Sequence, residues 1–482
     1  MKKKKVVVNY IYNMSYQVLS FLTPIITAPI LTRTLGSENI GIYDYTYSIV
    51  NWFIIFGMLG VTLYGNKEVA KASTKGRNEV SKTFSQIFTM QMTMIFISFA
   101  LFLLVFGLTN FEYKNIYLIQ GILIFASAFE ISWLYVGLEN FKKVAIRNIL
   151  IKILTVLGIV FLVKNKNDLI LYTAFVVITT ILSNLSLFKG IKKVVDVKIP
   201  NFDNFKKHLK ETIGLFIPQI ATTIYLVFSK TLIGILYPKI NEVGFYNYAD
   251  KMTTMVLYLV TTIGTVMLPH VVNTIASGKE DEARQMTNQT FKISLFLSLP
   301  IAIGLGCLAP YFIPWFLTNE FTKTGYVISC LAPTIVFISL SNVLGVQYLI
   351  SFERTRQYTI SIVSGSVVNV ISNLILIRDL GAYGAAISAC LTEFTVLMVQ
   401  YFFVRKDFNF EGVLSKLFKY LVCAVIMGIC VFLIGQWLGI GFLTNICQVI
   451  VGVVVYFVLL LITKDDILYF MFSKVKEIFK RK

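Results

Sequence analysis

Charged side chains interrupt the long apolar segments of this sequence and are its clearest candidates for chemistry. An ion in the hydrocarbon core of a bilayer costs several kcal/mol unless it faces a partner or water. Acids in such places could bind or sense a cation, and bases could bind an anionic group. The acidic candidates are Asp44, Glu130, Asp250 and Glu393, and the basic candidates are Arg33, Arg147, Lys152, Lys230 and Lys251.

The acids also have structural explanations. Glu130 and Lys152 lie at matching levels of a predicted helical hairpin, so an internal ion pair and a substrate contact both remain open. Asp44 lies in the first turn of a predicted helix, where the helix dipole favours a carboxylate. Glu393 has only neutral polar residues opposite it on the preceding predicted helix, which favours a titratable role.

The bases differ in depth. Arg33, Lys230 and Lys251 lie near one end of their predicted helices and could extend their ammonium or guanidinium groups to the lipid headgroups. Lys230, between Ser229 and Thr231, is about one turn deeper than this explanation needs. We therefore take Lys230 as the strongest candidate for a cation that faces an internal cavity.

No catalytic constellation is present in the sequence. The two histidines, His208 and His270, have no metal-ligand partner close in sequence, and no P-loop or Gx[ST]xG segment occurs. The cysteines lack CxxC spacing and are typical of small packing residues. We predict that the protein is not an enzyme and holds no metal or cofactor, apart from a possible coupling H⁺ or Na⁺.

The composition requires a membrane environment. Of 482 residues, 56% are hydrophobic and 14% are charged, so the apolar surface cannot be buried in a water-soluble core. The net charge of +19 is spread over short clusters between apolar segments. This distribution excludes a nucleic-acid-binding domain.

Windows of apolar residues predict about 14 spanning helices and an all-α integral membrane fold. The predicted spans are residues 9–32, 40–65, 83–107, 116–137, 148–163, 168–188, 212–236, 247–272, 290–317, 325–350, 358–377, 382–404, 415–436 and 442–463. Most of the 44 Lys and Arg residues then fall on the side that carries both termini. Because basic loops resist translocation, both termini are predicted to be cytoplasmic.

Two short stretches occur twice. Gly41-Ile42-Tyr43-Asp44-Tyr45 returns as Gly244-Phe245-Tyr246-Asn247-Tyr248, and Gly137-Leu138-Glu139-Asn140 is echoed by Ser351-Phe352-Glu353-Arg354. Such repeats predict two pseudo-symmetric lobes. We divide the chain into an N-lobe at 1–188, a basic linker at 189–211, a C-lobe at 212–404, and two further helices with a basic tail at 405–482. The pair Asp44 and Asn247 gives only one lobe a titratable group, and we take Asp44 as a candidate ion sensor.

Several motifs resemble the polysaccharide biosynthesis flippases of the multidrug/oligosaccharidyl-lipid/polysaccharide exporter superfamily. They are distributed over nearly the whole chain. They comprise Leu35-Gly36 through Gly41-Ile42-Tyr43, Leu59-Gly60, Tyr64-Gly65 with Glu68, Trp133-Leu134-Tyr135-Val136-Gly137-Leu138-Glu139, Val243-Gly244-Phe245-Tyr246 with Asp250-Lys251, Val266-Met267-Leu268-Pro269, and Asn369 through Leu380-Gly381-Ala382-Tyr383-Gly384 with Glu393.

The resemblance implies two six-helix lobes plus two C-terminal helices in a bacterial cytoplasmic membrane. It implies alternating access that carries a polyprenyl-pyrophosphate-linked oligosaccharide from the cytoplasmic to the outer leaflet. Its expected partners are this substrate, membrane lipids and a polysaccharide polymerase. A cationic central cavity would hold the pyrophosphate, formed on matching positions by Arg33, Arg147, Lys152, Lys230 and Lys251. His270 departs from the basic residue expected after the Leu-Pro pair.

Two other functions compete. A cation-coupled antiporter of small molecules or drugs belongs to the same superfamily, but its cavity would be acidic and aromatic. A membrane-embedded polysaccharide polymerase would need a sizeable extramembrane loop, whereas the predicted outer loops are short. The sequence does not specify the glycan, the driving ion or the oligomeric state.

Overall fold

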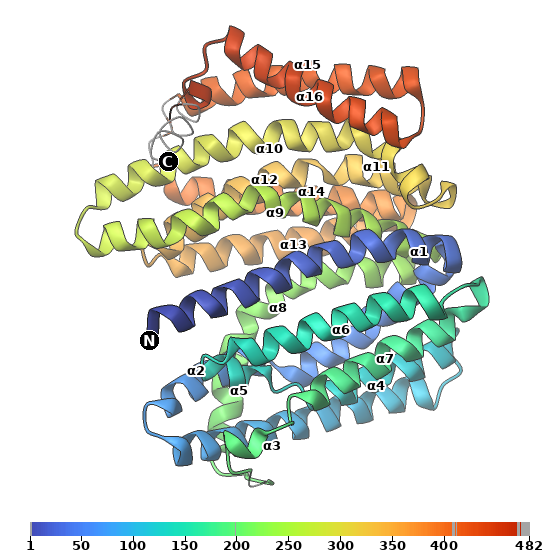
Figure 1. The fold of residues 1–482 in the computed structure, drawn as a ribbon, viewed down its shortest axis with the longest axis vertical. Coiled ribbons are helices and arrows are strands. Elements are labelled where there is room, and N and C mark those ends of the chain that lie inside the picture. Colours follow the sequence, from blue (N-terminus) through green and yellow to red (C-terminus); the bar gives the residue numbers. More distant parts are fainter. Residues whose placement is uncertain (1, 198, 407–409, 411, 470–472, 474–482) are drawn as a thin grey trace. The chain divides into compact units, whose positions relative to one another are not determined.

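The computed structural model describes residues 2–197, 199–406, 410, 412–469 and 473. Every regular element of this described part is a helix (Figure 1), which confirms the predicted all-α fold. The chain divides into two compact units, Met1–Thr231 and Leu232–Lys482. Much of the predicted basic tail, at residues 470–472 and 474–482, lies outside the described residues.

The first unit is built from long helices joined by short turns. Its helices are α1 (Lys2–Met58), α2 (Val61–Ser73), α3 (Arg77–Phe102), α4 (Lys114–Ser127), α5 (Ser132–Gly137), α6 (Phe141–Leu162), α7 (Leu169–Ser186) and the greater part of α8 (Phe205–Leu236). A π-helical turn, Leu103–Gly107, extends α3.

The second unit contains the end of α8 and all later helices. These are α9 (Asn241–Ala276), α10 (Glu280–Phe316), α11 (Thr322–Leu331), α12 (Pro333–Asn342), α13 (Thr355–Leu380), α14 (Ala382–Val404), α15 (Val413–Leu438) and α16 (Phe442–Ile462). A π-helical segment, Val343–Ile350, continues α12. In Figure 1, α15 and α16 lie side by side.

In the described part of the chain, 12 helical segments are long and apolar enough to cross a membrane. The first of them, Leu22–Ser73, covers the end of the span predicted at 9–32 and all of the span predicted at 40–65, and α1 breaks between the two at Gly36 (φ 77, ψ 173). A left-handed φ of this kind favours glycine, and the chain turns back beyond it (Figure 1). In α8, the residues whose side chains the structure describes include one shorter apolar helix, Val227–Leu236.

Several predicted spans have different bounds in the structure. The span predicted at 116–137 is interrupted at 128–131, and the one at 325–350 is divided at Pro333, whose missing N–H prevents a continuous ladder. The short span predicted at 148–163 is the end of the 22-residue helix α6. The hydropathy window missed its first two turns because they carry three basic residues, Lys142, Lys143 and Arg147.

The second repeated stretch has the same backbone geometry in each unit. Glu139 and Glu353 both adopt a left-handed conformation, with φ of 55° and 59°. The following N–H groups, of Asn140 and Arg354, each donate to a carbonyl five residues earlier at 2.7 Å. This equivalence supports an internal repeat.

The basic stretch predicted as a linker, 189–211, packs onto the first unit. The Asp196 N–H donates to Ser81 Oγ and the Asn201 N–H donates to Thr89 Oγ1, both at 2.9 Å. Ile191 and Val195 belong to the same apolar cluster as Trp133. This stretch is therefore an ordered part of the unit.

The predicted pair of C-terminal helices packs against α10 in the second unit. The Tyr456 hydroxyl of α16 donates to the carbonyl of Phe296 at 2.8 Å, and Tyr420 of α15 packs edge-on against the Phe296 ring at 5.6 Å between centroids. These three aromatic residues are fully or almost fully buried. The C-terminal pair thus shares a core with the second unit.

Candidate functional site

Asp44 occupies a polar and aromatic environment in the first unit. It follows the Gly36 break on α1, and it is 9% exposed. The Tyr43 ring packs on Tyr172 of α7 at 4.8 Å between centroids and stacks on Tyr47 at 6.1 Å. The Asp44 carboxylate is close enough to the hydroxyls of these three tyrosines to interact with them electrostatically. We call Tyr43, Asp44, Tyr47 and Tyr172 the tyrosine-aspartate cluster.

Lys230 lies beside the tyrosine-aspartate cluster. The next residue on α8, Thr231, donates to Ser48 Oγ at 3.0 Å and accepts a hydrogen bond from Trp52 Nε1 at 3.1 Å. These two bonds tie α8 to α1 about one and two turns beyond Asp44. The charges of Lys230 and Asp44 both act on the Tyr47 hydroxyl. Two charges that were predicted separately therefore lie near the same tyrosine.

The Glu130 carboxylate pairs with Arg147 and not with Lys152. Arg147 Nη1 donates to Glu130 Oε2 at 3.0 Å, with side chains 11% and 23% exposed. Glu130 Oε1 also accepts the Ser132 N–H at 2.9 Å, at the start of α5. The ion pair considered between Glu130 and Lys152 is therefore wrong in its partner, because Glu130 lies in the break between α4 and α5 and no longer at a helical level opposite Lys152.

The remaining predicted bases are more open. Arg33 and Lys251 are exposed, and Lys152 is half-buried. The Lys251 ammonium lies 5.3 Å from the centroid of the Tyr248 ring, at a distance where a cation is attracted to the ring face. Asp250, also half-buried, precedes it on α9.

Glu393 is the buried acid of the second unit. It is 9% exposed on α14. Its carboxylate is close enough to the Tyr358 hydroxyl and the Cys390 thiol to interact with them electrostatically. No ion pair of Glu393 occurs among the residues that the structure describes. The neighbouring Thr392 Oγ1 instead accepts a hydrogen bond from Asn369 Nδ2 at 3.0 Å, which joins α14 to α13.

Sequence reasoning missed a buried pair in the second unit. Glu242 is 4% exposed, and its Oε1 lies 2.5 Å from Lys323 Nζ. Its Oε2 accepts the Ala382 N–H at 3.0 Å, at the start of α14. Asn39, the equivalent position of the repeat, donates to the carbonyl of Lys166 at 2.7 Å, just before α7. Both residues precede the Gly-Φ-Tyr pattern that occurs twice in the chain, which was a usable signal, but their distant partners are not visible in sequence.

The arrangement suits binding more than bond breaking. Within the described residues, no group of three His, Cys, Asp or Glu side chains is placed to hold a metal ion. The tyrosine-aspartate cluster with Lys230 offers hydroxyl groups, aromatic faces, one carboxylate and one ammonium group. Such a set can bind a sugar through its hydroxyls and C–H faces, an anion through the ammonium group, or a cation through the carboxylate.

Comparisons with known proteins give a consistent picture. The chain matches the family model described as polysaccharide biosynthesis protein over residues 6–275 and the MatE model over residues 215–375. A proposed O-antigen transporter of Shigella dysenteriae is 25% identical over 389 residues, which cover 79% of this chain and 95% of that protein. A proposed O-antigen transporter of Escherichia coli K12 is 24% identical over 413 residues, covering 83% and 96%.

A solved structure shares the fold. The lipid II flippase MurJ in an inward closed conformation superimposes with a TM-score of 0.76 at 19% identity, covering 96% of this chain and 100% of that one. At this identity the likeness concerns the fold alone. The all-helical fold of this chain therefore already exists among membrane proteins.

Proposed function

This chain belongs to the polysaccharide biosynthesis protein family, and we propose that it is a flippase for lipid-linked oligosaccharides. In this proposal it moves polyprenyl-pyrophosphate-linked repeat units from the cytoplasmic to the outer leaflet for assembly of a surface polysaccharide. It acts as a transporter and catalyses no covalent step. The proposed O-antigen transporters, matched over most of the chain, support this substrate class.

The observation that carries the proposal is the position of Lys230 beside the tyrosine-aspartate cluster. A pyrophosphate cannot cross hydrocarbon without compensation of its charge. An ammonium group held within a spanning segment lowers that barrier by a charge-assisted contact. The neighbouring tyrosines offer ring faces and hydroxyls to the sugars, while the polyprenyl chain stays in the bilayer.

The structure changes the set of bases that we assign to the pyrophosphate. Arg147 is engaged by Glu130, so we propose that it positions α5 and α6. Lys230, Arg33 and Lys152 in the first unit, and Lys251 in the second, remain candidate bases for the pyrophosphate. Alternating access would expose these groups first to one leaflet and then to the other.

A cation-coupled antiporter is the second candidate. The MatE match over residues 215–375 and the buried acids Asp44 and Glu393 favour it. An antiporter needs an acid whose protonation or ion binding changes with the transport state. The same acids could couple H⁺ or Na⁺ to oligosaccharide movement, so the cargo distinguishes the two candidates.

We place the protein in the bacterial cytoplasmic membrane with both termini in the cytoplasm. The 12 apolar segments of the described chain support a multi-pass protein. The excess of Lys and Arg on the side of the termini supports the orientation. Fusion of a reporter that is active only outside the cytoplasm to the C-terminus tests it, and no activity is expected.

Deletion of the gene tests the cargo. We expect lipid-linked repeat units to collect on the cytoplasmic leaflet, where an impermeant sugar-labelling reagent cannot reach them in intact cells. Unpolymerised units that are accessible outside would instead assign the protein to polymerisation. An unchanged distribution of these lipids with increased sensitivity to cationic drugs would favour the antiporter.

Substitution of Lys230 tests the site. Lys230→Ala should reduce complementation of the deletion strain at least tenfold while protein levels stay normal. Lys164→Ala, which removes an exposed lysine between α6 and α7, is the matched control and should complement fully. Full complementation by Lys230→Ala would remove Lys230 from the site.

A further inference from the structure

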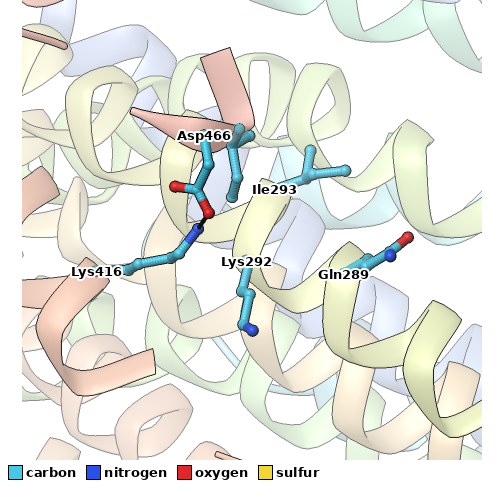
Figure 2. Close-up of a pocket in the computed structure, with 6 residues that line it drawn as sticks. Gln289, Lys292, Ile293, Lys416 and Asp466 are labelled. Carbon is cyan, nitrogen blue, oxygen red and sulfur yellow. Dashed lines mark hydrogen bonds and ion pairs between the residues drawn. The ribbon is translucent and has the colours of Figure 1, made fainter. Parts of the chain in front are cut away.

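A second cationic site lies far along the chain from the tyrosine-aspartate cluster, within the second unit. A cavity of about 260 Å³ is lined by Gln289, Lys292, Ile293, Lys416, Asp466 and Ile467. These residues come from the first third of α10, the first turn of α15 and the segment after α16 (Figure 2). None of them was singled out by the sequence, and the proposed transport cycle does not use them.

The polar groups of the pocket leave a positive charge in excess. Lys416 Nζ lies 2.8 Å from Asp466 Oδ2, with side chains 17% and 78% exposed. Their contact lowers the pKa of the Asp466 carboxyl below its ordinary value, chiefly through the Lys416 hydrogen bond, so this acid stays ionised and balances Lys416. Lys292 is not balanced in this way.

Lys292 has no hydrogen bond or ion pair with any residue that the structure describes. Its side chain is half-buried on α10, and Figure 2 shows its ammonium group pointing away from the Lys416–Asp466 pair. The Gln289 side chain, one turn earlier on the same helix, adds an amide to the same wall. Because the acid that lines the recess, Asp466, is already paired with Lys416, the Lys292 ammonium group is available to an external anion.

The residues around the pocket suit a lipid headgroup. Exposed apolar side chains continue from the pocket along the neighbouring helices: Leu414 and Phe418 on α15 are 77% and 69% exposed, and Ile462 at the end of α16 is 70% exposed. The pocket therefore lies where charged helix ends meet an apolar wall. By the excess of bases on the side of the termini, this end faces the cytoplasmic leaflet, whose anionic lipids are attracted to basic pockets between helices.

We propose that the pocket formed by Lys292, Gln289 and the Lys416–Asp466 pair binds a phosphate group, as carried by an anionic phospholipid headgroup. Lys292 contacts the phosphate directly, and Lys416 can share a second N–H donor with it while it holds Asp466. Ile293 and Ile467 contact the glycerol and the first methylenes of the acyl chains. The site is separate from the cargo and does not depend on its identity.

The test uses the full-length protein in a neutral detergent. Short-chain phosphatidylglycerol and, in a separate arm, inorganic phosphate are titrated while the thermal unfolding midpoint is followed, with short-chain phosphatidylcholine as the neutral control. Phosphatidylglycerol should raise the midpoint in a saturable way, and phosphatidylcholine should not. Inorganic phosphate is expected to act only at much higher concentration, because it lacks the apolar contacts.

Three variants make the assignment specific. Lys292→Gln should weaken phosphatidylglycerol binding about fivefold or more, the effect of one lost cation near a lipid surface, and Lys292→Arg should preserve it. Asp466→Asn should tighten binding, because Lys416 is released to the ligand. Lys279→Gln, which removes an exposed lysine that pairs with Glu282, is the matched control and should bind as the wild type does.

The outcomes separate the two phosphate sources. Saturable binding of phosphatidylglycerol that depends on Lys292 supports a lipid site, and Lys292-dependent binding of inorganic phosphate at equal concentration supports the phosphate site with a soluble source. Equal binding by the wild type and Lys292→Gln in both arms overturns the proposal. A Lys292→Gln variant that does not fold is replaced in this comparison by Asp466→Asn, whose failure to tighten binding also overturns it.

Discussion

Arg147 Nη1 donates a hydrogen bond to Glu130 Oε2 at 3.0 Å, while its Nε donates to Asn148 Oδ1 at 2.9 Å. Two of the residues that the sequence assigned to opposite roles are thus one structural unit. Glu130 also accepts the Ser132 N–H, so the pair fixes the junction of α4, α5 and α6. The Glu130 carboxylate balances the charge of Arg147, so this guanidinium offers no uncompensated positive charge to a substrate.

Removal of either partner should therefore lower stability. In Arg147→Gln or Glu130→Gln one mostly buried charge loses its counterion, at a cost of about 1–3 kcal/mol. The double variant should be closer to the wild type than the sum of the single variants, because no unpaired charge remains. Thermal unfolding of the three purified variants measures this coupling. Single variants with wild-type stability and defective transport would return Arg147 to the substrate-binding set.

Asp44→Asn tests the ion-sensing hypothesis. The substitution keeps the size of the side chain and leaves a hydrogen-bonding group about two turns past the Gly36 break, and it reproduces Asn247 of the second repeat. We expect protein levels to be normal and transport to lose its dependence on pH or Na⁺, with at least a tenfold lower rate. The reciprocal variant Asn247→Asp is the control, since it adds a carboxylate in the other unit. Normal transport with an unchanged ion dependence would leave Asp44 with a structural role only.

His208 should make stability depend on pH. It is buried, its Nδ1 lies 2.7 Å from the Tyr64 hydroxyl, and its Nε2 lies 3.1 Å from Gln86 Oε1. Burial lowers the pKa of His208 from its ordinary value of 6.5, although Glu211 and Glu68 oppose this and Lys207 adds to it. The unfolded chain therefore binds a proton at a higher pH than the folded protein does.

This difference in proton binding sets the direction in which stability changes with pH. Stability is complete above pH 6.5, the ordinary pKa of histidine, and decreases as the pH falls below it, because protonation favours the unfolded chain. The unfolding midpoint should fall more between pH 7.5 and about 5.5 in the wild type than in His208→Gln, whose side chain cannot be protonated. A midpoint that rises with acidification would mean that Glu211 and Glu68 stabilise the imidazolium.

Gly65→Ala should destabilise the first unit. A methyl group at this position of α2 would lie 2.6 Å from Cε3 of Trp133. This ring is fully buried, and its Nε1 donates to Gln91 Oε1 at 3.0 Å, so it cannot move aside easily. We expect a loss of about 1–3 kcal/mol, measured by thermal unfolding. Gly214→Ala, where nothing lies within 4 Å, should be neutral or slightly stabilising.

Apolar segment length was enough to predict the helices, because a spanning helix satisfies its backbone groups within itself. Their interruptions were less visible. The break at Gly36 depends on a single left-handed residue, and the gap at 128–131 contains neither Gly nor Pro. The start of α6 was missed because its basic residues lower the mean hydropathy of that stretch to a value typical of a loop. On a helix, the same residues can extend toward the lipid headgroups at the membrane surface.

Amino-acid type by itself identified Asp44, Lys230, Arg147 and Glu393 as costly in a membrane, because the penalty for a charge in hydrocarbon is a property of the residue. Which charges meet was decided by the tertiary structure. Glu130 reaches Arg147 because α4 ends before it, and Lys230 lies near Asp44 because Thr231 ties α8 to Ser48 on α1. Such contacts join residues that are distant in the chain, and their geometry depends on how helices pack, which no local pattern records.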